Sequence, residues 1–312
     1  MDRRDFLKAI ALTGVAMIIK PGGTMDLLAQ SVTDPATGGK TDLIAVMGGE
    51  PDAMFRKAIA EMGGMKKFVK AGAKVAVKPN IGWDKKPEEA ANTNPELVAE
   101  IVRQALAAGA SEVTVFDHTC NEWQSCYKNS GIAAAVTEAG GKVLPANLKE
   151  HYSRVERPEA VKMKNALIHN AILEADVFIN VPVLKHHGGA KMSCAMKNFM
   201  GLVEDRGFMH RNDLQQCIAD ICTLQKKPVL NVVDAYRVMK TNGPRGQSAD
   251  DVVLAKGLFV SPDIVAVDTA ATKFFNQIRE MPMESVGHLA NGQALNIGTT
   301  DLDKLNVKRI KL

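Results

Sequence analysis

Apolar and polar positions follow one another along this chain in the order expected of repeated strand–helix units. Short apolar runs that suit buried strands occur at residues 42–47, 73–80, 111–119, 141–146, 175–184, 227–235 and 257–261. Helical patterns are placed between or after them at residues 52–62, 94–109, 129–139, 212–225 and 262–278. This alternation predicts an α/β fold: a doubly wound, mostly parallel sheet with helices on both faces.

Individual residues mark where several of these elements begin or end. Asn94 suits a helix N-cap and Pro95 the first helical position, with Gly109 following the last turn. We likewise expect Asn212 to cap the next-to-last helix and Pro262 to occupy the first position of the last one. Pro182 indicates a strand end or edge. Residues 151–170 are less regular and are interpreted as an insertion, and residues 204–213 as a mobile loop.

The N-terminus has the features of a twin-arginine export signal. Arg3 and Arg4 are followed by Phe-Leu-Lys and by an apolar stretch, residues 9–19, that is too short to span a bilayer. The alternative is an amphipathic first helix. We therefore expect a signal peptide at residues 1–30, a linker at 31–41 and one α/β domain at 42–312. This predicts a periplasmic or otherwise exported protein and the twin-arginine translocation machinery as a partner.

Charge and cysteine content narrow the function classes. The formal net charge is +4 with no basic stripe, which argues against nucleic-acid binding. Five cysteines are an odd number, so a disulfide framework is not the economical interpretation. Cys217 lies at helical spacing with apolar neighbours and is expected in the core. Met192, Met196 and Met200, spaced four apart, favour a core face over a copper site.

Polar residues collect at the carboxyl ends of four of the predicted strands, directly after the apolar run of each. Lys78 and Asn80 follow one apolar run, Asp117 and His118 the next, Lys185 to His187 a third, and Asp234 a fourth. In parallel sheets the carboxyl ends of strands share one crevice, so these groups are expected to converge. None of the common signatures for dinucleotide, phosphate-loop, serine-hydrolase or zinc-protease sites is present.

Several motifs together resemble a known family. The segments KPNIGW, TNPELVAEIV, INVPVLKHH, MKNFMG, NGPRG and SPDIVAVDTAA occur in the order seen in the family called domain of unknown function 362, over about residues 41–277. The family is largely uncharacterised, and fusion of some members to ferredoxin modules implies a redox partner. The resemblance carries its polar signature onto Lys78, Asn80, Asn94, Lys185, His187, Lys197, Asn198, His210, Asp234 and Asp268. This chain departs from it at His186 and Cys194 and has no attached ferredoxin cysteines.

Our first hypothesis is an enzyme that acts on a small anionic molecule in a crevice lined by lysine, histidine and asparagine. The catalytic candidates are Lys185, His187, Lys197, Asn198 and His210. The substrate-binding candidates are Lys78, Asn80, Asn94 and Asp234. Lysines would neutralise a carboxylate or phosphate, a lysine beside other cations can act as a nucleophile or base, and histidines would transfer protons.

The second hypothesis is a metal or iron–sulfur site, because thiolates and imidazoles suit transition metals. Its candidate ligands are His118, Cys120, Cys126, His186 and Cys194. A competing interpretation is a local disulfide between Cys120 and Cys126 after export. A third hypothesis is a non-catalytic periplasmic protein that captures an anion or metal. The sequence alone does not decide whether the protein is an enzyme, nor which reaction, substrate or cofactor it would use.

Overall fold

The computed structural model describes residues 15–19, 25–29 and 41–312. The Arg3–Arg4 pair and most of the predicted signal and linker lie outside the described residues, so the export prediction stays a prediction. Near the start, β1 (Val15–Ile19) and β2 (Met25–Ala29) pair in antiparallel fashion. Within the described ranges, no helix combines the length and the apolar character needed to cross a bilayer.

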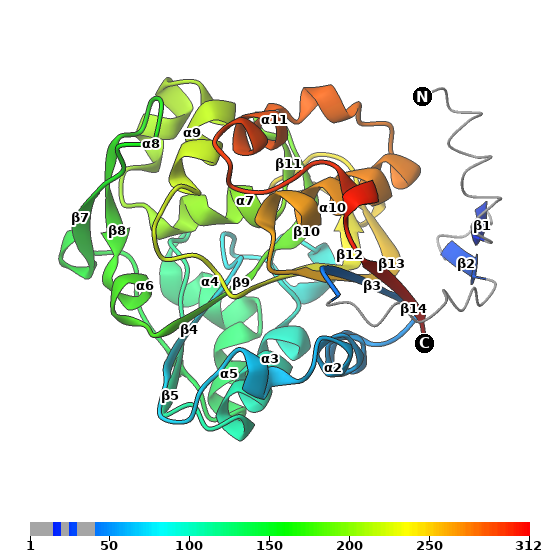
Figure 1. The fold of residues 1–312 in the computed structure, drawn as a ribbon, viewed down its shortest axis with the longest axis horizontal. Coiled ribbons are helices and arrows are strands. Elements are labelled where there is room, and N and C mark those ends of the chain that lie inside the picture. The colour runs from blue at the N-terminus through cyan, green and yellow to red at the C-terminus, as the bar shows by residue number, and fades with distance from the viewer. Residues whose placement is uncertain (1–14, 20–24, 30–40) are drawn as a thin grey trace.

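The core of the molecule is a ten-stranded sheet that is mostly parallel, as the sequence predicts (Figure 1). Only β13 runs antiparallel to its neighbours along the main path, and β11 pairs antiparallel with β10 at the side. β10 itself lies parallel to β12. The main order is β14 (Val307–Lys311), β3 (Leu43–Met47), β13 (Val252–Ser261), β12 (Leu230–Met239), β9 (Val177–Val181), β4 (Lys74–Pro79), β5 (Glu112–Val115) and β6 (Lys142–Val143), with β10 (Val183–His187) and β11 (Lys191–Ser193) off this path.

Helices cover both faces of this sheet, which explains why its central strands are buried and mostly apolar. In β9, Val177 and Ile179 belong to one hydrophobic cluster and Phe178 to the other. One face carries α2 (Pro51–Glu61), α3 (Pro95–Ala107), α4 (Trp123–Asn129) and α5 (Ile132–Glu138). The other carries α7 (Ala195–Asn198), α9 (Leu214–Ile221), α10 (Ile264–Ile278) and α11 (Gly287–Ala294). Figure 1 shows these two groups on opposite sides of the strands.

Helix α3 begins as predicted, but two other helix starts differ. The Asn94 side chain accepts a hydrogen bond from the Glu96 backbone N–H, and α3 starts at the next residue. Helix α9 is capped by Asp213 instead of Asn212, and α10 by Asp263, so Pro262 lies outside the helix. In each case a carboxylate accepts backbone N–H groups of the first turn, which is a stronger start signal than the residue we expected.

Two regions are more regular than the sequence suggests. The expected insertion contains the antiparallel pair β7 (Tyr152–Glu156) and β8 (Asn165–His169), followed by α6 (Asn170–Glu174). The expected mobile loop contains α8 (Arg206–Arg211), whose N-cap Asp205 accepts a hydrogen bond from the Phe208 N–H. Short polar-rich helices of this kind carry little periodic signal.

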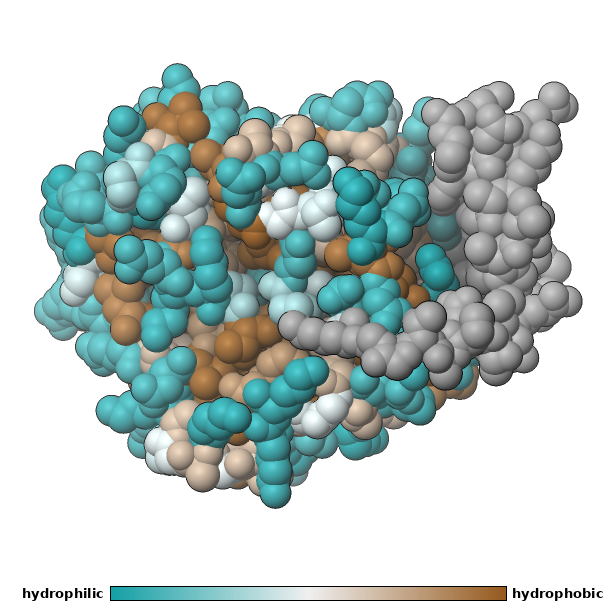
Figure 2. Space-filling model, viewed as in Figure 1, coloured by the Kyte–Doolittle hydropathy of each residue, from teal (hydrophilic) through white to brown (hydrophobic). Residues whose placement is uncertain are grey.

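The face of the molecule drawn in Figure 2 is hydrophilic over much of its described area. The face in Figure 2 shows apolar side chains in patches between larger polar areas. Among the described residues, the exposed large apolar side chains are Leu148, Val161 and Leu312, which are separate in sequence. Cys217, Met192, Met196 and Met200 are buried in the core, as predicted.

Candidate functional site

The centre of the candidate site is an ion pair between Lys78 and Asp117 at the ends of two adjacent strands. Lys78 lies in β4 and Asp117 follows β5, and because these strands are parallel their ends lie side by side. The Lys78 Nζ atom is 2.7 Å from the Asp117 Oδ1 atom and donates a hydrogen bond of 2.7 Å to the Asn198 Oδ1 atom. Burial lowers the pKa of Lys78, and the Asp117 carboxylate opposes that shift.

A chain of buried asparagine amides extends from this pair across the sheet. The Asn198 Nδ2 atom donates to the Lys78 carbonyl at 3.0 Å and to the Asn180 Oδ1 atom at 2.8 Å. Asn180 in turn donates to the Asn231 Oδ1 atom at 2.9 Å. The motifs of the sequence indicated Asn198 but not Asn180 or Asn231. Their signal was an amide inside an otherwise apolar strand, where an unpaired polar group would be costly.

Gly201, the glycine of the MKNFMG segment, lies against the ion pair of Lys78 and Asp117. A Cβ atom at this position would lie 1.9 Å from the Asp117 Oδ1 atom and 2.5 Å from the Lys78 Nζ atom. The chain therefore passes directly over the ion pair, and a side chain here would displace it. The Gly201 carbonyl also accepts the His118 N–H at 3.3 Å.

Lys185 is buried without a carboxylate partner. Only 1% of this residue is exposed, and its Nζ atom donates to the Asn80 Oδ1 atom at 2.9 Å and to the Ala91 carbonyl. Burial lowers the pKa of Lys185 to about 7, and the positive charges of Lys197 and Lys78 add to this effect. A large share of these amines is therefore neutral near pH 7.

Lys197 lies in the short helix α7, which Asp268 holds in place. The two carboxylate oxygens of Asp268 accept the Ala195 N–H at 2.7 Å and the Met196 N–H at 2.9 Å. Lys197 is half-buried, and its amine donates to the thioether sulfur of Met200 at 2.9 Å. Burial, followed by the nearby charges of Arg206 and Lys78, lowers the pKa of Lys197 to about 8.

Arg206 adds a fourth cationic group that the sequence analysis did not identify. Its guanidinium donates to the carbonyls of His118 at 2.8 Å and Thr119 at 2.7 Å, and to the Cys120 sulfur at 3.4 Å. Arg206 is the first residue of α8, the helix hidden within the expected loop. It is also one of the charges that act on Lys78 and Lys197.

The geometry of His187 changes its expected role. Its Nδ1 atom accepts hydrogen bonds from the Gly189 N–H at 3.1 Å and the Ala190 N–H at 3.0 Å. These two donors require a lone pair on Nδ1, so the imidazole is neutral with its proton on Nε2. Burial, followed by the charges of Lys197 and Lys185, lowers the pKa of His187 to about 2. His187 is therefore a hydrogen-bond donor and not the proton-transfer group we expected.

Two other histidines keep a nitrogen lone pair near these cations. His118 donates from Nδ1 to the Val203 carbonyl at 2.8 Å, which leaves its Nε2 lone pair available. His210, an exposed residue of α8, has its pKa lowered by burial and by the charges of Lys197 and Arg206. The structure places two predicted residues beside the same group of cations. They are His118, predicted as a metal ligand, and His210, predicted as a catalytic residue.

Asp234 and Asn94 belong to the frame of the fold and not to this group. The Asp234 carboxylate accepts the Asn94 N–H at 2.7 Å and the Tyr236 N–H at 3.0 Å, while the Asn94 side chain caps α3. Burial raises the pKa of Asp234 to about 6. Our expectation that these two residues bind substrate needs correction, because their polar atoms are used to join α3 to β12.

The five predicted metal ligands do not form one ligand set. Cys126 is packed in the hydrophobic cluster on one face of the sheet and Cys194 in the cluster on the other face. The Nδ1 atom of His186 accepts the Gly243 N–H, and Cys120 contacts Arg206. Among the residues that the structure describes, no three histidine, cysteine or acidic side chains are grouped to hold a metal. The five cysteines are free, and a disulfide between exposed Cys120 and buried Cys126 is not formed.

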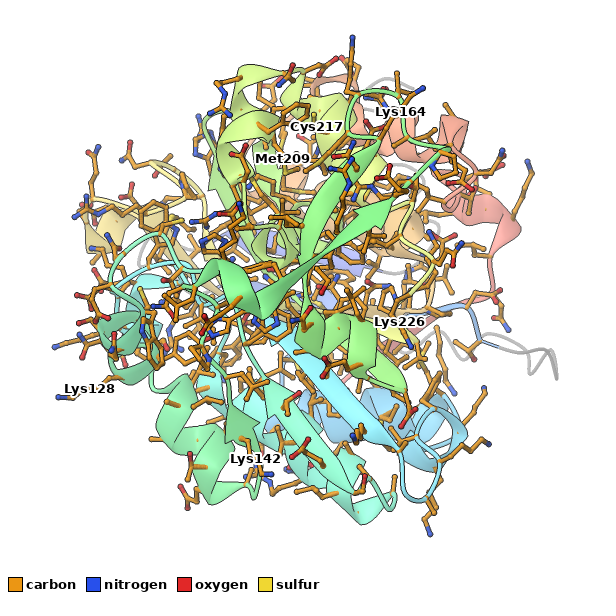
Figure 3. All side chains as sticks on the ribbon, turned by 90° about the vertical axis from the view of Figure 1, so that its left-hand side faces the viewer. Lys128, Lys142, Lys164, Met209, Cys217 and Lys226 are labelled. Carbon is orange, nitrogen blue, oxygen red and sulfur yellow. The ribbon has the colours of Figure 1, made fainter. Side chains whose placement is uncertain are left out.

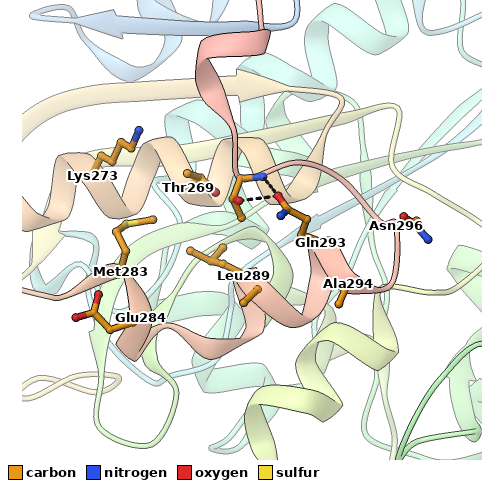
Figure 4. Close-up of a pocket in the computed structure, with 10 residues that line it drawn as sticks. Thr269, Lys273, Met283, Glu284, Leu289, Gln293, Ala294 and Asn296 are labelled. Atoms are coloured by element: carbon orange, nitrogen blue, oxygen red, sulfur yellow. Dashed lines mark hydrogen bonds between the residues drawn. The ribbon is translucent and has the colours of Figure 1, made fainter. Parts of the chain in front are cut away.

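A cavity in the described part of the chain lies away from these residues. This cavity of about 620 Å³ is formed by α10, α11 and the segments after each, and the Gln293 Oε1 atom on its wall accepts two hydrogen bonds from Thr300 (Figure 4). None of our candidate residues lines it. We therefore locate the site by its chemistry and not by cavity size.

Comparison with protein families confirms the family resemblance seen in the sequence motifs. The sequence profile of the family described as "Domain of unknown function (DUF362)" matches residues 75–273, well over half of the chain. The chain belongs to this family. The matched range contains Lys78, Asp117, Lys185, Lys197 and Arg206, so the whole cationic group is part of the family domain.

Similar individual proteins give no further assignment of function. The thylakoid-associated protein sll1697 of Synechocystis sp. is 25% identical over 228 residues, covering 70% of this chain and 68% of that protein. A crystal structure of a Thermotoga maritima protein matches with a TM-score of 0.45 and 10% identity, over 73% of this chain and 60% of that one. The lactate racemase apoprotein of Thermoanaerobacterium thermosaccharolyticum matches with a TM-score of 0.40 and 14% identity, over 85% and 62%.

Proposed function

We propose that this protein binds a small anionic molecule, a carboxylate or phosphate, at the group formed by Lys78, Lys185, Lys197 and Arg206, and that it acts on this molecule as an enzyme. One observation carries the proposal: Lys197 lies close enough to Lys78, Lys185 and Arg206 for their charges to affect one another, while Asp117 is the single carboxylate paired with any of the four in the described structure. An anion would relieve this repulsion, and it would be bound most strongly where water is excluded.

The same arrangement supports proton transfer on a bound anion. Lys185 and Lys197, with pKa values of about 7 and 8, can each exist as a neutral amine or as an ammonium near neutral pH. A group whose pKa lies close to the working pH is the best general acid or base. His187 would offer its Nε2 proton to an anion, and Asn80 and Asn198 would keep the lysine amines in position through their carbonyl oxygens.

Anion binding is tested by titrating inorganic phosphate into the purified protein in a calorimeter at low ionic strength. We expect Lys185→Met to weaken phosphate binding at least about tenfold, which corresponds to about 1.4 kcal/mol. The matched control is Lys128→Met, because Lys128 is exposed and points away from the molecule (Figure 3). Equal phosphate affinity in the wild type and in both variants would refute a binding site at the lysines.

A non-catalytic binding protein is the second candidate function. It is favoured by the geometry of His187, whose Nδ1 atom is already used by two backbone donors and cannot accept a proton. This candidate predicts tight phosphate or carboxylate binding with no chemical change in any small carboxylate or phosphate ester supplied. Conversion of one such compound, lost in Lys197→Met but not in Lys128→Met, would instead establish an enzyme.

We also propose that the protein is exported by the twin-arginine route. The support is the sequence pattern around Arg3 and Arg4. Replacing both residues by lysine keeps the charge but removes the paired guanidinium groups. We expect the double variant to remain in the cytoplasmic fraction of the producing cell, and its appearance outside the inner membrane at the wild-type level would contradict the proposal.

A further inference from the structure

Lys197 differs from the other two lysines of the site in what its amine contacts. The Lys78 amine is held by Asp117 and Asn198, and the Lys185 amine by Asn80 and a backbone carbonyl. In the described structure, the one hydrogen bond recorded for the Lys197 amine goes to the Met200 sulfur. A thioether is a weak acceptor, so this amine is held far less firmly than its neighbours.

Lys197 is also more exposed than the other two lysines. Lys78 is completely buried and Lys185 is 1% exposed, whereas Lys197 is half-buried. A reagent that reached Lys78 or Lys185 would have to displace strong oxygen acceptors, and at Lys78 it would meet the backbone of Gly201 as well. Lys197 therefore combines a weakly held amine with a residue that is less deeply buried than Lys78 and Lys185.

The surroundings also favour the neutral, nucleophilic form of this amine. Burial and the charges of Arg206 and Lys78 lower the pKa of Lys197 to about 8. At pH 7.5 about a quarter of such amines are neutral, against about a thousandth for an ordinary lysine, a difference of about two orders of magnitude. The same neighbouring cations would attract a negatively charged reactant to the place where the neutral amine is available.

We propose that the Lys197 amine forms an imine with the carbonyl carbon of a small oxo acid, whose carboxylate is bound by the neighbouring cations. This inference rests on the proposed anion site and names the class of its reactant. Arg206 supplies positive charge for the carboxylate, and the arriving carboxylate favours the protonated form of Lys185. Lys197 supplies the nucleophile, a role for which amines beside other cationic groups are suited.

The proposed step balances without an added oxidant or reductant. The nitrogen lone pair of the neutral amine attacks the carbonyl carbon, and the π electrons of the C=O bond move to oxygen, which takes up a proton. The resulting carbinolamine loses its hydroxyl group as water while a proton leaves the nitrogen. The net change is the formation of one C=N bond with release of one water molecule.

The experiment is reductive trapping of the full-length protein with glyoxylate and cyanoborohydride at pH 7.5, with the modified lysines located by tandem mass spectrometry. We expect a carboxymethyl group on the Nζ atom of Lys197, formed about two orders of magnitude faster than on the exposed Lys128. Inorganic phosphate should slow trapping at Lys197 but not at Lys128. Acetaldehyde, which lacks a carboxylate, should trap Lys197 more slowly than glyoxylate does, and equal rates would refute carboxylate recognition.

The matched variants are Lys197→Arg and Lys128→Arg, which keep the positive charge but remove the nucleophilic amine. Lys197→Arg should lose the fast phase of trapping, and Lys128→Arg should keep both this phase and phosphate binding. If the wild type binds phosphate but traps glyoxylate at Lys197 no faster than at Lys128, the imine is refuted and the anion site stands. If phosphate does not bind to the wild type, the proposed function itself fails.

Discussion

The substitution Gly201→Ala tests whether the backbone of the MKNFMG segment keeps the buried ion pair in place. The new Cβ atom would lie 1.9 Å from the Asp117 Oδ1 atom and 2.7 Å from the Lys78 Cε atom. Contacts this short do not persist, so Lys78 and Asp117 must move apart or the chain at Gly201 must shift. Either movement also disturbs the hydrogen bond between Lys78 and Asn198.

The expected change in the free energy of unfolding follows from the loss of the ion pair. Breaking a buried ion pair costs about 3–5 kcal/mol, because a charge is left without its partner. Replacing a helical glycine by alanine returns up to about 1 kcal/mol. We therefore expect a net loss of about 2–4 kcal/mol in the free energy of unfolding, which lowers the melting temperature by about 4–8 °C for a domain of this size.

Scanning calorimetry of Gly201→Ala beside Gly188→Ala measures this loss. Gly188 is a suitable control because a Cβ atom there would have nothing within 4 Å, and its φ angle is not in the left-handed region. Gly188→Ala should melt within about 1 °C of the wild type. If Gly201→Ala melts at the same temperature as the control, the argument from the ion pair is wrong.

Three further predictions follow from buried ionisable groups: the site lysines Lys185 and Lys197, the α11 residue His288, and Asp268. Lys185 and Lys197 have native pKa values of about 7 and 8, below the unfolded value of 10.5. Between the native and unfolded pKa values the unfolded state binds more protons than the native state, so stability rises with pH. The urea midpoint should therefore rise from pH 7 to pH 9.5. A falling midpoint would contradict this sign. Burial lowers the pKa of His288 to about 3, so its neutral form stabilises the protein above the unfolded pKa of 6.5, and this contribution is lost as the pH falls. The stability difference between the wild type and His288→Gln should shrink by about 1.4 kcal/mol from pH 6 to pH 5, and a constant difference would refute it. Asp268→Asn leaves one backbone N–H of α7 without an acceptor. Because α7 carries Lys197, this substitution should weaken phosphate binding about tenfold. Unchanged phosphate binding in a folded variant would show that Asp268 does not position the helix.

The convergence of Lys78 and Asp117 could be predicted from the sequence for a simple reason. Both residues follow apolar strands of the kind that pair in parallel, and parallel neighbours end at the same edge of the sheet. The pairing of Lys185 with Asn80 follows a related logic, since Asn80 follows β4 and Lys185 lies in β10, which begins just after β9, the neighbour of β4. Periodicity therefore indicates which ends meet, even though it contains no information on individual contacts.

Other parts of the site depend on contacts that no local pattern records. Arg206 lies in a short helix within a stretch of mixed charge, and it meets the loop after β5 only because the chain folds back there. Asp234 looked like a site residue because it ends a conspicuous apolar run. Its carboxylate is instead used by two backbone N–H groups. Position at a strand end thus predicts proximity to the crevice but not whether the side chain is free to act.

The energetics of the buried lysines argue against a purely structural role for this cluster. A buried ion pair such as Lys78 with Asp117 can usually be replaced by apolar residues without loss of stability, and a buried cation without a carboxylate, such as Lys185, is more costly still. The fold reduces that cost by lowering the pKa of Lys185 and by providing the Asn80 and Ala91 oxygens, but it does not remove it. Stability alone would favour leucine or methionine at such a position. Keeping several mutually repelling cationic groups around a single carboxylate becomes more favourable when a negatively charged ligand binds, and this supports our proposal that the cluster binds an anion.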